Sequence, residues 1–276
     1  MKRSNLRLII FLTLLYIWAM GNALSAERLD AFFKAALDIE GFGESDNALN
    51  GIQVDNDGSD IQKIAFGVDA SMETFERAAA CRAGMLFVHH GLFWGKPLRV
   101  AGNHRQRIKF LLDHNICLYA VHLPLDQHPK LGNNAVIAKL LGLANVEPFG
   151  TYHGKKVGYK GTFPQPIGIN EAFKKISFMD RPPLGVFPFG KQENKTCAVV
   201  SGGAAFEALQ ALEESIDLYV TGEASHQIYN ECLEGKLNMI AGGHYNTEVW
   251  GARELMQYCA VELNIDTEFI DVPTGL

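Results

Sequence analysis

Short apolar segments with the period of strands alternate with amphipathic segments along most of this chain, and this alternation constrains its fold most strongly. The expected strands are residues 62–68, 84–89, 116–122, 196–200, 217–221, 237–241 and 266–270. The expected helices are residues 27–38, 71–83, 104–114, 133–141, 204–214, 224–234 and 246–260. Strands and helices that alternate at these lengths predict an α/β fold with largely parallel sheets.

Four segments are expected along the chain. Residues 1–26 form a leader, 27–144 an N-terminal α/β half, 145–194 a small middle subdomain and 195–276 a C-terminal α/β half. The middle segment differs because it is rich in Gly, Pro and Lys and contains one helical pattern, near 169–178. A chain of 276 residues can form a full core in one large domain or in two modest ones.

The leader has two interpretations. Three basic residues precede an apolar stretch from Leu8 to Met20, which is typical of a secretory signal peptide and short for a membrane span. A start codon assigned too early, with Met20 as the true start, is the other interpretation. A misassigned start implies a cytoplasmic protein, and a true signal implies an exported one. A retained membrane anchor ranks behind both, and in every case residues 1 to about 25 lie outside the fold.

The charge and the cysteine content indicate which binding partners and which cellular compartment to expect. The net charge of −6 lacks the basic balance of a nucleic-acid-binding protein, so nucleic acid is not an expected partner. The five cysteines are scattered and form no C-x-x-C pair, which argues against a disulfide framework and against a cysteine zinc site. Reduced thiols of this kind are typical of the cytoplasm.

Histidines and carboxylates follow the carboxyl ends of the predicted strands, where ligands bind in parallel α/β sheets. His89 and His90 end the strand at 84–89, and His122 and Asp126 come just past the strand at 116–122. Taken alone, Asp126 also suits ordinary turn chemistry, because it lies between two prolines.

A third strand end contains the strongest candidates. After the strand at 237–241, a Gly-Gly turn leads into a helix with His244 and Glu248 four residues apart, on one helical face. A solvated Glu near the start of a helix is the ordinary alternative. Glu223 follows a fourth strand end and is expected to form part of the pocket wall or to support a ligand, with a plain helix start as the alternative.

With His122 and Glu223 left aside, these strand ends supply three imidazoles and two carboxylates and no cysteine, a donor set that suits Zn, Mn, Fe or a similar divalent ion. Five ligands exceed the three of an ordinary catalytic zinc site and suffice for two metals if one carboxylate bridges them. Two divalent ions beside two carboxylates leave about two positive charges for hydroxide or phosphate to balance.

The motifs that carry these residues resemble a known family when they are taken in order. VHHGLFW, LYAVHLPLDQHPKLGNN, TGEASHQ and AGGHYNTE, with NALNGIQV at 47–54, are similar to the YbgI-like dinuclear metal centre family, whose members are labelled GTP cyclohydrolase 1 type 2 homologues. The resemblance runs from about residue 27 to the last residue, and the combination of motifs is more specific than any one of them.

The resemblance implies a ligand set, a fold and an assembly. Its metal ligands fall on His89, His90, Asp126, His244 and Glu248, with Glu248 bridging, whereas His122 matches a supporting position. The implied fold has two α/β halves packed together, and the implied assembly is a toroidal homo-hexamer with inward-facing metal sites. The leader departs from the family pattern, and the short middle region implies the compact form of the family.

Two functions from different classes are compatible with these features. The first is a dinuclear metal-dependent hydrolase of a small molecule such as a nucleotide, and the family label implies opening of the guanine imidazole ring of GTP with release of formate. The second is a non-catalytic metal-binding ring that handles metal or acts as a scaffold. A ring that encircles nucleic acid is a third interpretation, and the acidic charge balance counts against it.

Overall fold

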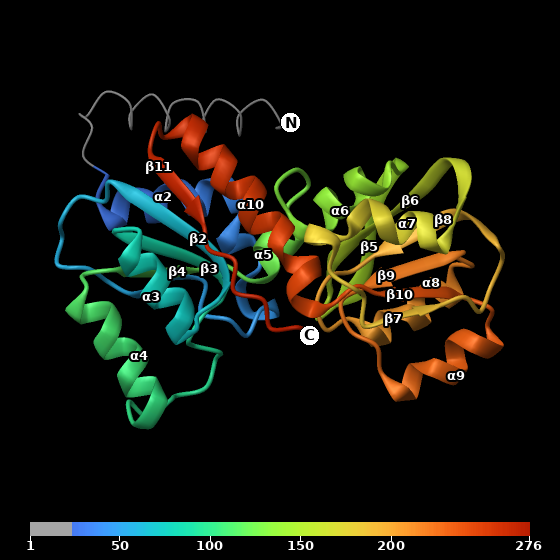
Figure 1. Cartoon of the computed structure of the whole chain (residues 1–276), viewed down its shortest axis with the longest axis horizontal. Coiled ribbons are helices and arrows are strands. Elements are labelled where there is room, and N and C mark those ends of the chain that lie inside the picture. The colour runs from blue at the N-terminus through green and yellow to red at the C-terminus, as the bar shows by residue number, and fades with distance from the viewer. Residues whose placement is uncertain (1–23) are drawn as a thin grey trace.

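The computed structural model describes residues 24–276, which form two β-sheets side by side with helices on their faces (Figure 1). The leader expected at 1–26 therefore lies almost entirely outside the described residues. Within the described range, none of the helices combines the length and the apolar character that crossing a membrane requires.

The first sheet has five strands and is mostly parallel. Its spatial order is β1 (Gly51–Val54), β4 (Cys117–Ala120), β3 (Met85–His90), β2 (Lys63–Asp69) and β11 (Asp266–Phe269). β2 pairs in parallel with β3 and β11, and β3 with β4, whereas β1 runs antiparallel to β4 at one edge. The carboxyl ends of β2, β3 and β4 therefore lie at one edge of the sheet.

Helices cover both faces of the first sheet, which explains the nearly continuous apolar sequence of its strands. One face packs against α2 (Ala26–Leu37) and α10 (His244–Glu262), and the other against α3 (Met72–Ala80) and α4 (Gly102–Asp113). Successive residues of β2 alternate between the two cores, with Ile64 and Phe66 on the first face and Ala65 on the second. Ser71 caps α3 by accepting a hydrogen bond from the backbone N–H of Thr74 at 3.2 Å.

The second sheet has six strands and is mixed. Its order is β5 (Ala144–Tyr152), β6 (Lys155–Gly168), β8 (Glu193–Val199), β9 (Leu218–Thr221), β10 (Asn238–Ala241) and β7 (Gly185–Phe187). Only β8, β9 and β10 run parallel to one another, and the β5–β6, β6–β8 and β10–β7 pairs are antiparallel. The largely parallel pairing expected from the sequence thus describes the first sheet and the centre of the second.

Helices also cover both faces of the second sheet (Figure 1). One face packs against α6 (Asn133–Leu141) and α7 (Ile169–Ile176), and the other against α8 (Ala208–Glu213) and α9 (His226–Glu234). The remaining helical segments are α5 (Leu123–Gln127) and the single 3-10 turns η1 (Ile39–Gly41), η2 (Gly43–Ser45), η3 (Phe178–Asp180) and η4 (Ala205–Glu207). Gly142 ends α6 with φ of 77°, a left-handed conformation that glycine adopts without strain.

The sheets divide the chain differently from the expected segments. Residues 145–194 supply most of β5, all of β6 and β7, and the start of β8, so their strands extend the second sheet on both sides. The last part of the segment 195–276 returns to the first sheet, because β11 pairs with β2. Long antiparallel strands with Gly and Pro in them do not show the clean alternation on which the expected boundaries rested.

α10 joins the two halves. Its first turn lies at the second sheet, directly after β10, and its later residues Leu255 and Cys259 belong to the core of the first sheet. The helix therefore passes through the region where the carboxyl ends of both parallel strand sets meet (Figure 1).

Candidate metal centre

The end of β3 places two imidazoles at the junction of the sheets. His89 is fully buried, and its Nδ1 lies 3.0 Å from the carbonyl oxygen of Val121. Nδ1 of His90 lies 2.8 Å from Oδ1 of Asp69, the last residue of the neighbouring strand β2. A carbonyl or a carboxylate oxygen can only accept a hydrogen bond, so each Nδ1 donates and the lone pair of a neutral ring lies on Nε2.

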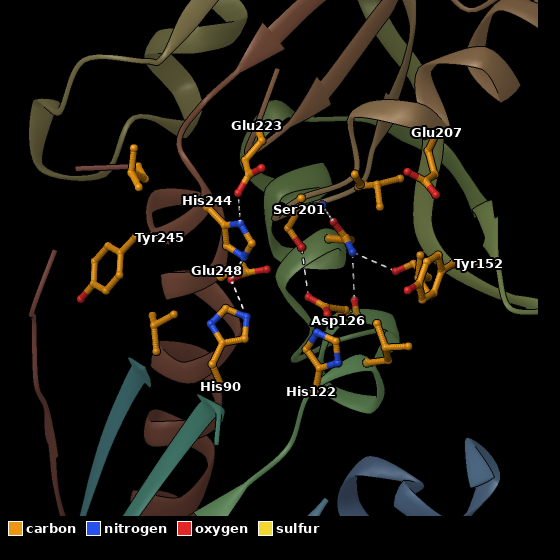
Figure 2. A pocket seen from close by; sticks show the side chains of 18 of the residues that line it. His90, His122, Asp126, Tyr152, Ser201, Glu207, Glu223, His244, Tyr245 and Glu248 are labelled. Atoms are coloured by element: carbon orange, nitrogen blue, oxygen red, sulfur yellow. Dashed lines mark hydrogen bonds and ion pairs between the residues drawn. The ribbon is translucent and has the colours of Figure 1, made fainter. Parts of the chain in front are cut away.

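The start of α10 contributes a third imidazole and a carboxylate. His244 is the first residue of the helix, and Glu248 follows one turn later on the same face. Nδ1 of His244 lies 2.6 Å from Oε1 of Glu223, which leaves Nε2 of His244 directed toward Glu248 at 3.2 Å (Figure 2). This ring is therefore oriented in the same way as the two rings on β3.

Glu248 lies at the centre of the cluster, with its two oxygens facing different neighbours. Oε1 is 3.6 Å from Nε2 of His89, and Oε2 is 3.2 Å from Nε2 of both His90 and His244. Glu248 thus belongs to two groups of candidate metal ligands, one with His89 and Asp126 and one with His90 and His244, and the candidate ligand atoms within each group lie within 4.8 Å of one another.

Asp126 completes the first group from α5. Its Oδ1 accepts hydrogen bonds from Nδ2 of Asn133 at 2.9 Å and from Oγ of Ser201 at 3.0 Å. Its Oδ2 lies 3.4 Å from Nε2 of His89. One carboxylate oxygen is therefore fixed by neutral donors, and the other is directed into the cluster.

The turn at Gly202 fits closely against Glu248. Gly202 has φ of +67°, and a Cβ on this residue would overlap Oε1 of Glu248. Its backbone N–H donates to Oγ1 of Thr247 at 3.0 Å, which ties the turn to the first turn of α10. Only glycine satisfies both the positive φ and the close approach at this position.

The donors of the cluster are of the kinds that bind divalent cations. Nε2 of His89 and Oε2 of Glu248 are buried and have no hydrogen-bond partner among the described residues, which is uncommon for buried polar atoms. Burial works against charge on both groups, yet Asp126 and Glu248 hold the pKa of His89 well above its usual value, and the neighbouring histidines hold the pKa of Glu248 well below its own. Imidazole and carboxylate donors suit Zn, Mn or Fe.

His122 adjoins the two groups and belongs to neither. It forms a further cluster with His89 and His90, and its ring centroid lies 5.1 Å from that of His89. Its Nδ1 lies 2.9 Å from Oδ1 of Asp46. Burial raises the pKa of Asp46, but the hydrogen bond and charge of His122, with further hydrogen bonds from Asn50 and the Ala48 backbone, lower it to about 2. His122 therefore stays oriented beside the cluster, as a supporting position would be.

The cluster lies at the wall of a cavity of about 700 Å³. His90, Asp126, His244 and Glu248 line it, and Figure 2 shows their side chains converging from β3, α5 and α10. Most of the remaining wall is apolar and aromatic, and it includes Trp94, Leu123, Tyr152, Val157, Val200, Phe206 and Tyr245. A cavity of this size and character is typical of a small-molecule site.

The structure brings together all five residues expected as ligands and places His122 and Glu223 beside them. The motif analysis did not single out Asp46, Asp69 or Asn133, although each orients a member of the cluster. A signal existed for Asp69, because it ends the strand next to β3 and obeys the same strand-end rule. Asn133 begins a helix and carries no such signal.

Fold and site together define a class: an α/β protein of two sheets with a cluster of histidines and carboxylates at their junction. The profile of the Duf34/NIF3 (NGG1p interacting factor 3) family matches residues 24–274, and the chain belongs to this family. The resemblance inferred from the motifs is therefore confirmed.

Relatives and solved structures agree over nearly the full chain. A protein from Pyrococcus horikoshii named GTP cyclohydrolase 1 type 2 homolog is 42% identical over 252 residues, which cover 91% of this chain and 99% of that protein. One of the same name from Treponema pallidum is 36% identical, with 92% and 100% covered. The structure of the protein ybgI, described as of unknown function, is 32% identical with a TM-score of 0.84, and 92% of this chain and all of that one are covered. The crystal structure of a protein from Thermus thermophilus is 36% identical with a TM-score of 0.81 and the same coverage.

Proposed function

We propose that this protein binds two divalent metal ions per chain and acts as a metal-dependent hydrolase of a nucleotide or a related small molecule. The observation that carries the proposal is the shared carboxylate of Glu248, whose two oxygens face two separate ligand groups. His89 and Asp126 would hold one ion, His90 and His244 the other, and Glu248 both. A carboxylate between two groups of three donors is the arrangement that a two-metal site needs.

The reaction that the site could support follows from the charge of the proposed ions and of their ligands. Two ions bound here would supply an activated water and polarise the attacked atom. Each imidazole is neutral as a ligand, so Asp126 and Glu248 leave about two positive charges, which favours an anionic substrate such as a phosphate ester. The hydrogen bonds to Asp69, Glu223 and the Val121 carbonyl hold the three rings in place before a substrate arrives.

A nucleotide is the substrate class that the surroundings favour. The relatives from Pyrococcus horikoshii and Treponema pallidum are named as GTP cyclohydrolase 1 type 2 homologs. The cavity of about 700 Å³ lies within the range of small-molecule sites and joins an aromatic wall to the ligand cluster. A phosphate at the cluster and a base at the wall would use both surfaces.

Glu248→Gln tests the proposal directly. An amide cannot bridge two cations as a carboxylate does, so we expect metal content to fall from about two ions per chain to near none, with loss of turnover. Elemental analysis and an assay for formate release from GTP measure the two effects. Glu254→Gln is the matched control, because Glu254 lies on the same helix and pairs with Lys139 at the surface.

The outcomes separate the two functions. If the wild type stays metal-free after addition of Zn or Mn, both the proposed dinuclear site and the proposed hydrolase function are wrong. A wild type that binds metal and turns over no substrate in a panel of nucleotides would favour the non-catalytic ring instead.

Assembly and location form part of the same proposal. The family resemblance favours a homo-hexamer, which light scattering of the metal-loaded protein tests.

The five cysteines are free and four of them are buried, which favours a reducing, cytoplasmic environment. Mass spectrometry of the native N-terminus would distinguish a cleaved leader from a late start.

A further inference from the structure

Five carboxylate side chains line the cavity, and Glu207 alone has no partner on another described residue. Asp69 and Glu223 face histidines, Asp126 accepts two hydrogen bonds, and Glu248 lies among three imidazoles. Glu207, on η4, accepts a hydrogen bond from its own backbone N–H, and no other residue in the described part of the chain forms a hydrogen bond or ion pair with its side chain. The described residues that line the cavity include no Lys or Arg, so no cationic side chain of the wall neutralises this carboxylate, and it stays available to a ligand that carries N–H donors.

The neighbouring strand fixes the position of Glu207. The side chain of Gln210, one turn further along, accepts from the backbone N–H of Thr151 at 2.8 Å and donates to the Thr151 carbonyl at 3.1 Å. A Cβ at Gly150 would lie 4.0 Å from Cγ of Glu207. These contacts tie η4 and α8 to β5, and Figure 2 shows Glu207 and Tyr152 together at the side of the cavity opposite His244.

The protein leaves this carboxylate only partly satisfied. Burial raises the pKa of Glu207, since no neighbouring cation offsets the loss of water. The nearby buried hydroxyl of Tyr219 is not available as a donor to Glu207, because it donates to the carbonyl oxygen of Ala204 at 2.6 Å. A half-buried carboxylate without a partner on another residue contributes little to folding and is better explained by binding.

We propose that Glu207 is a specificity-determining residue that accepts N–H donors from a planar ring of the ligand. The proposal rests on the proposed function, because the anionic end of the same ligand would lie at the metal centre. Tyr152 and Phe206 are 40% and 51% exposed and offer aromatic surface beside Glu207. The ring class that suits a carboxylate best has a ring N–H next to an amino group, as on the edge of guanine, because both can donate to its two oxygens.

The test compares two nucleotides that differ only in the amino group. Isothermal titration of the metal-loaded full chain with guanosine monophosphate and with inosine monophosphate gives a preference ratio. We expect the wild type to prefer the guanine nucleotide by at least about tenfold, the effect of one charge-assisted hydrogen bond. In Glu207→Gln and Glu207→Ala the ratio falls to within about threefold of one, because the second acceptor is gone.

Controls separate this inference from the proposed function. Glu213→Gln, an exposed position on α8, should keep the wild-type ratio. The Glu207 variants should keep their metal content and their thermal unfolding midpoint, which a purely structural carboxylate would not. Wild type that binds both nucleotides equally, or a preference that survives in both variants, overturns the role of Glu207 and leaves the hydrolase standing. Metal-loaded wild type that binds neither nucleotide overturns both.

Discussion

The two sheets contribute to the candidate metal centre in different ways. The first sheet supplies His89 and His90 as consecutive residues of one strand, and each ring is fixed from behind, by the Val121 carbonyl or by Asp69. The second sheet supplies His244 and Glu248 from a helix, whose first turn is placed by the fit of a glycine turn. Strand pairing thus positions His89 and His90, whereas close packing positions His244 and Glu248.

The difference has a physical consequence. Backbone hydrogen bonds within a parallel sheet are numerous and tolerate most side-chain changes, so the β3 half of the centre has redundant support. The helix half depends on a few tight contacts in which one added atom has no room. Substitutions that add atoms should therefore damage the packed turn of the second half more than the strands of the first.

Gly202→Ala should have the largest effect. The added methyl group would overlap Glu248 and also meets the positive φ of this residue, so we expect about 1–3 kcal/mol of lost stability and a strong loss of bound metal. Urea unfolding and elemental analysis measure these effects. Gly154→Ala is the matched control, since Gly154 has φ of +79° but open space around its Cα. Equal metal loss in both variants would contradict the close-packing account.

Asp69→Ala should have an intermediate effect. It removes the acceptor that fixes the ring of His90, and loss of such a partner typically weakens metal binding by about 10–100-fold. Competition with a chromogenic chelator measures the affinity. Asp60→Ala, at an exposed position of the same half, should leave the affinity unchanged. An unchanged affinity in Asp69→Ala would mean that strand pairing alone positions His90.

Glu223→Ala should have the smallest effect of the three. Its carboxylate orients His244 but is 47% exposed, against 32% for Asp69, so water can replace it more readily. We expect a loss of metal affinity below about tenfold, in the same chelator assay. A larger loss than in Asp69→Ala would reverse the order and show that His244, not His90, relies more on its supporting carboxylate.

Much of the centre could be predicted from the sequence because its ligands obey one rule. His89 and His90 end a parallel strand, Asp126 and His244 follow the ends of two others, and Glu248 shares a helical face with His244. Strand ends are visible locally, as the end of an apolar run before glycine or proline. The family motifs then identified the same residues, and the structure brings them within ligand distance of one another.

The remaining features depend on contacts between distant segments. The pairing of β11 with β2 joins residues about 200 positions apart and leaves no local trace. β5 and β6 contain glycines and prolines that hide their strand character, although they form a long antiparallel pair. Glu207 lies on a short 3-10 turn, and the role proposed for it rests on the absence of a partner on any other described residue, which only the surroundings of a residue can reveal.

Because α10 and β11 come last in the chain, the first sheet and the ligand cluster can be completed only at the end of synthesis. His89 and His90 leave the ribosome early, but Glu248 and the strand that completes the first sheet emerge last. Because β11 forms the edge beside β2 and α10 fills the core above it, the first half cannot reach its native packing on the nascent chain. The candidate ligands on β3 and on α10 therefore come together only after the last residues of the chain have been synthesised.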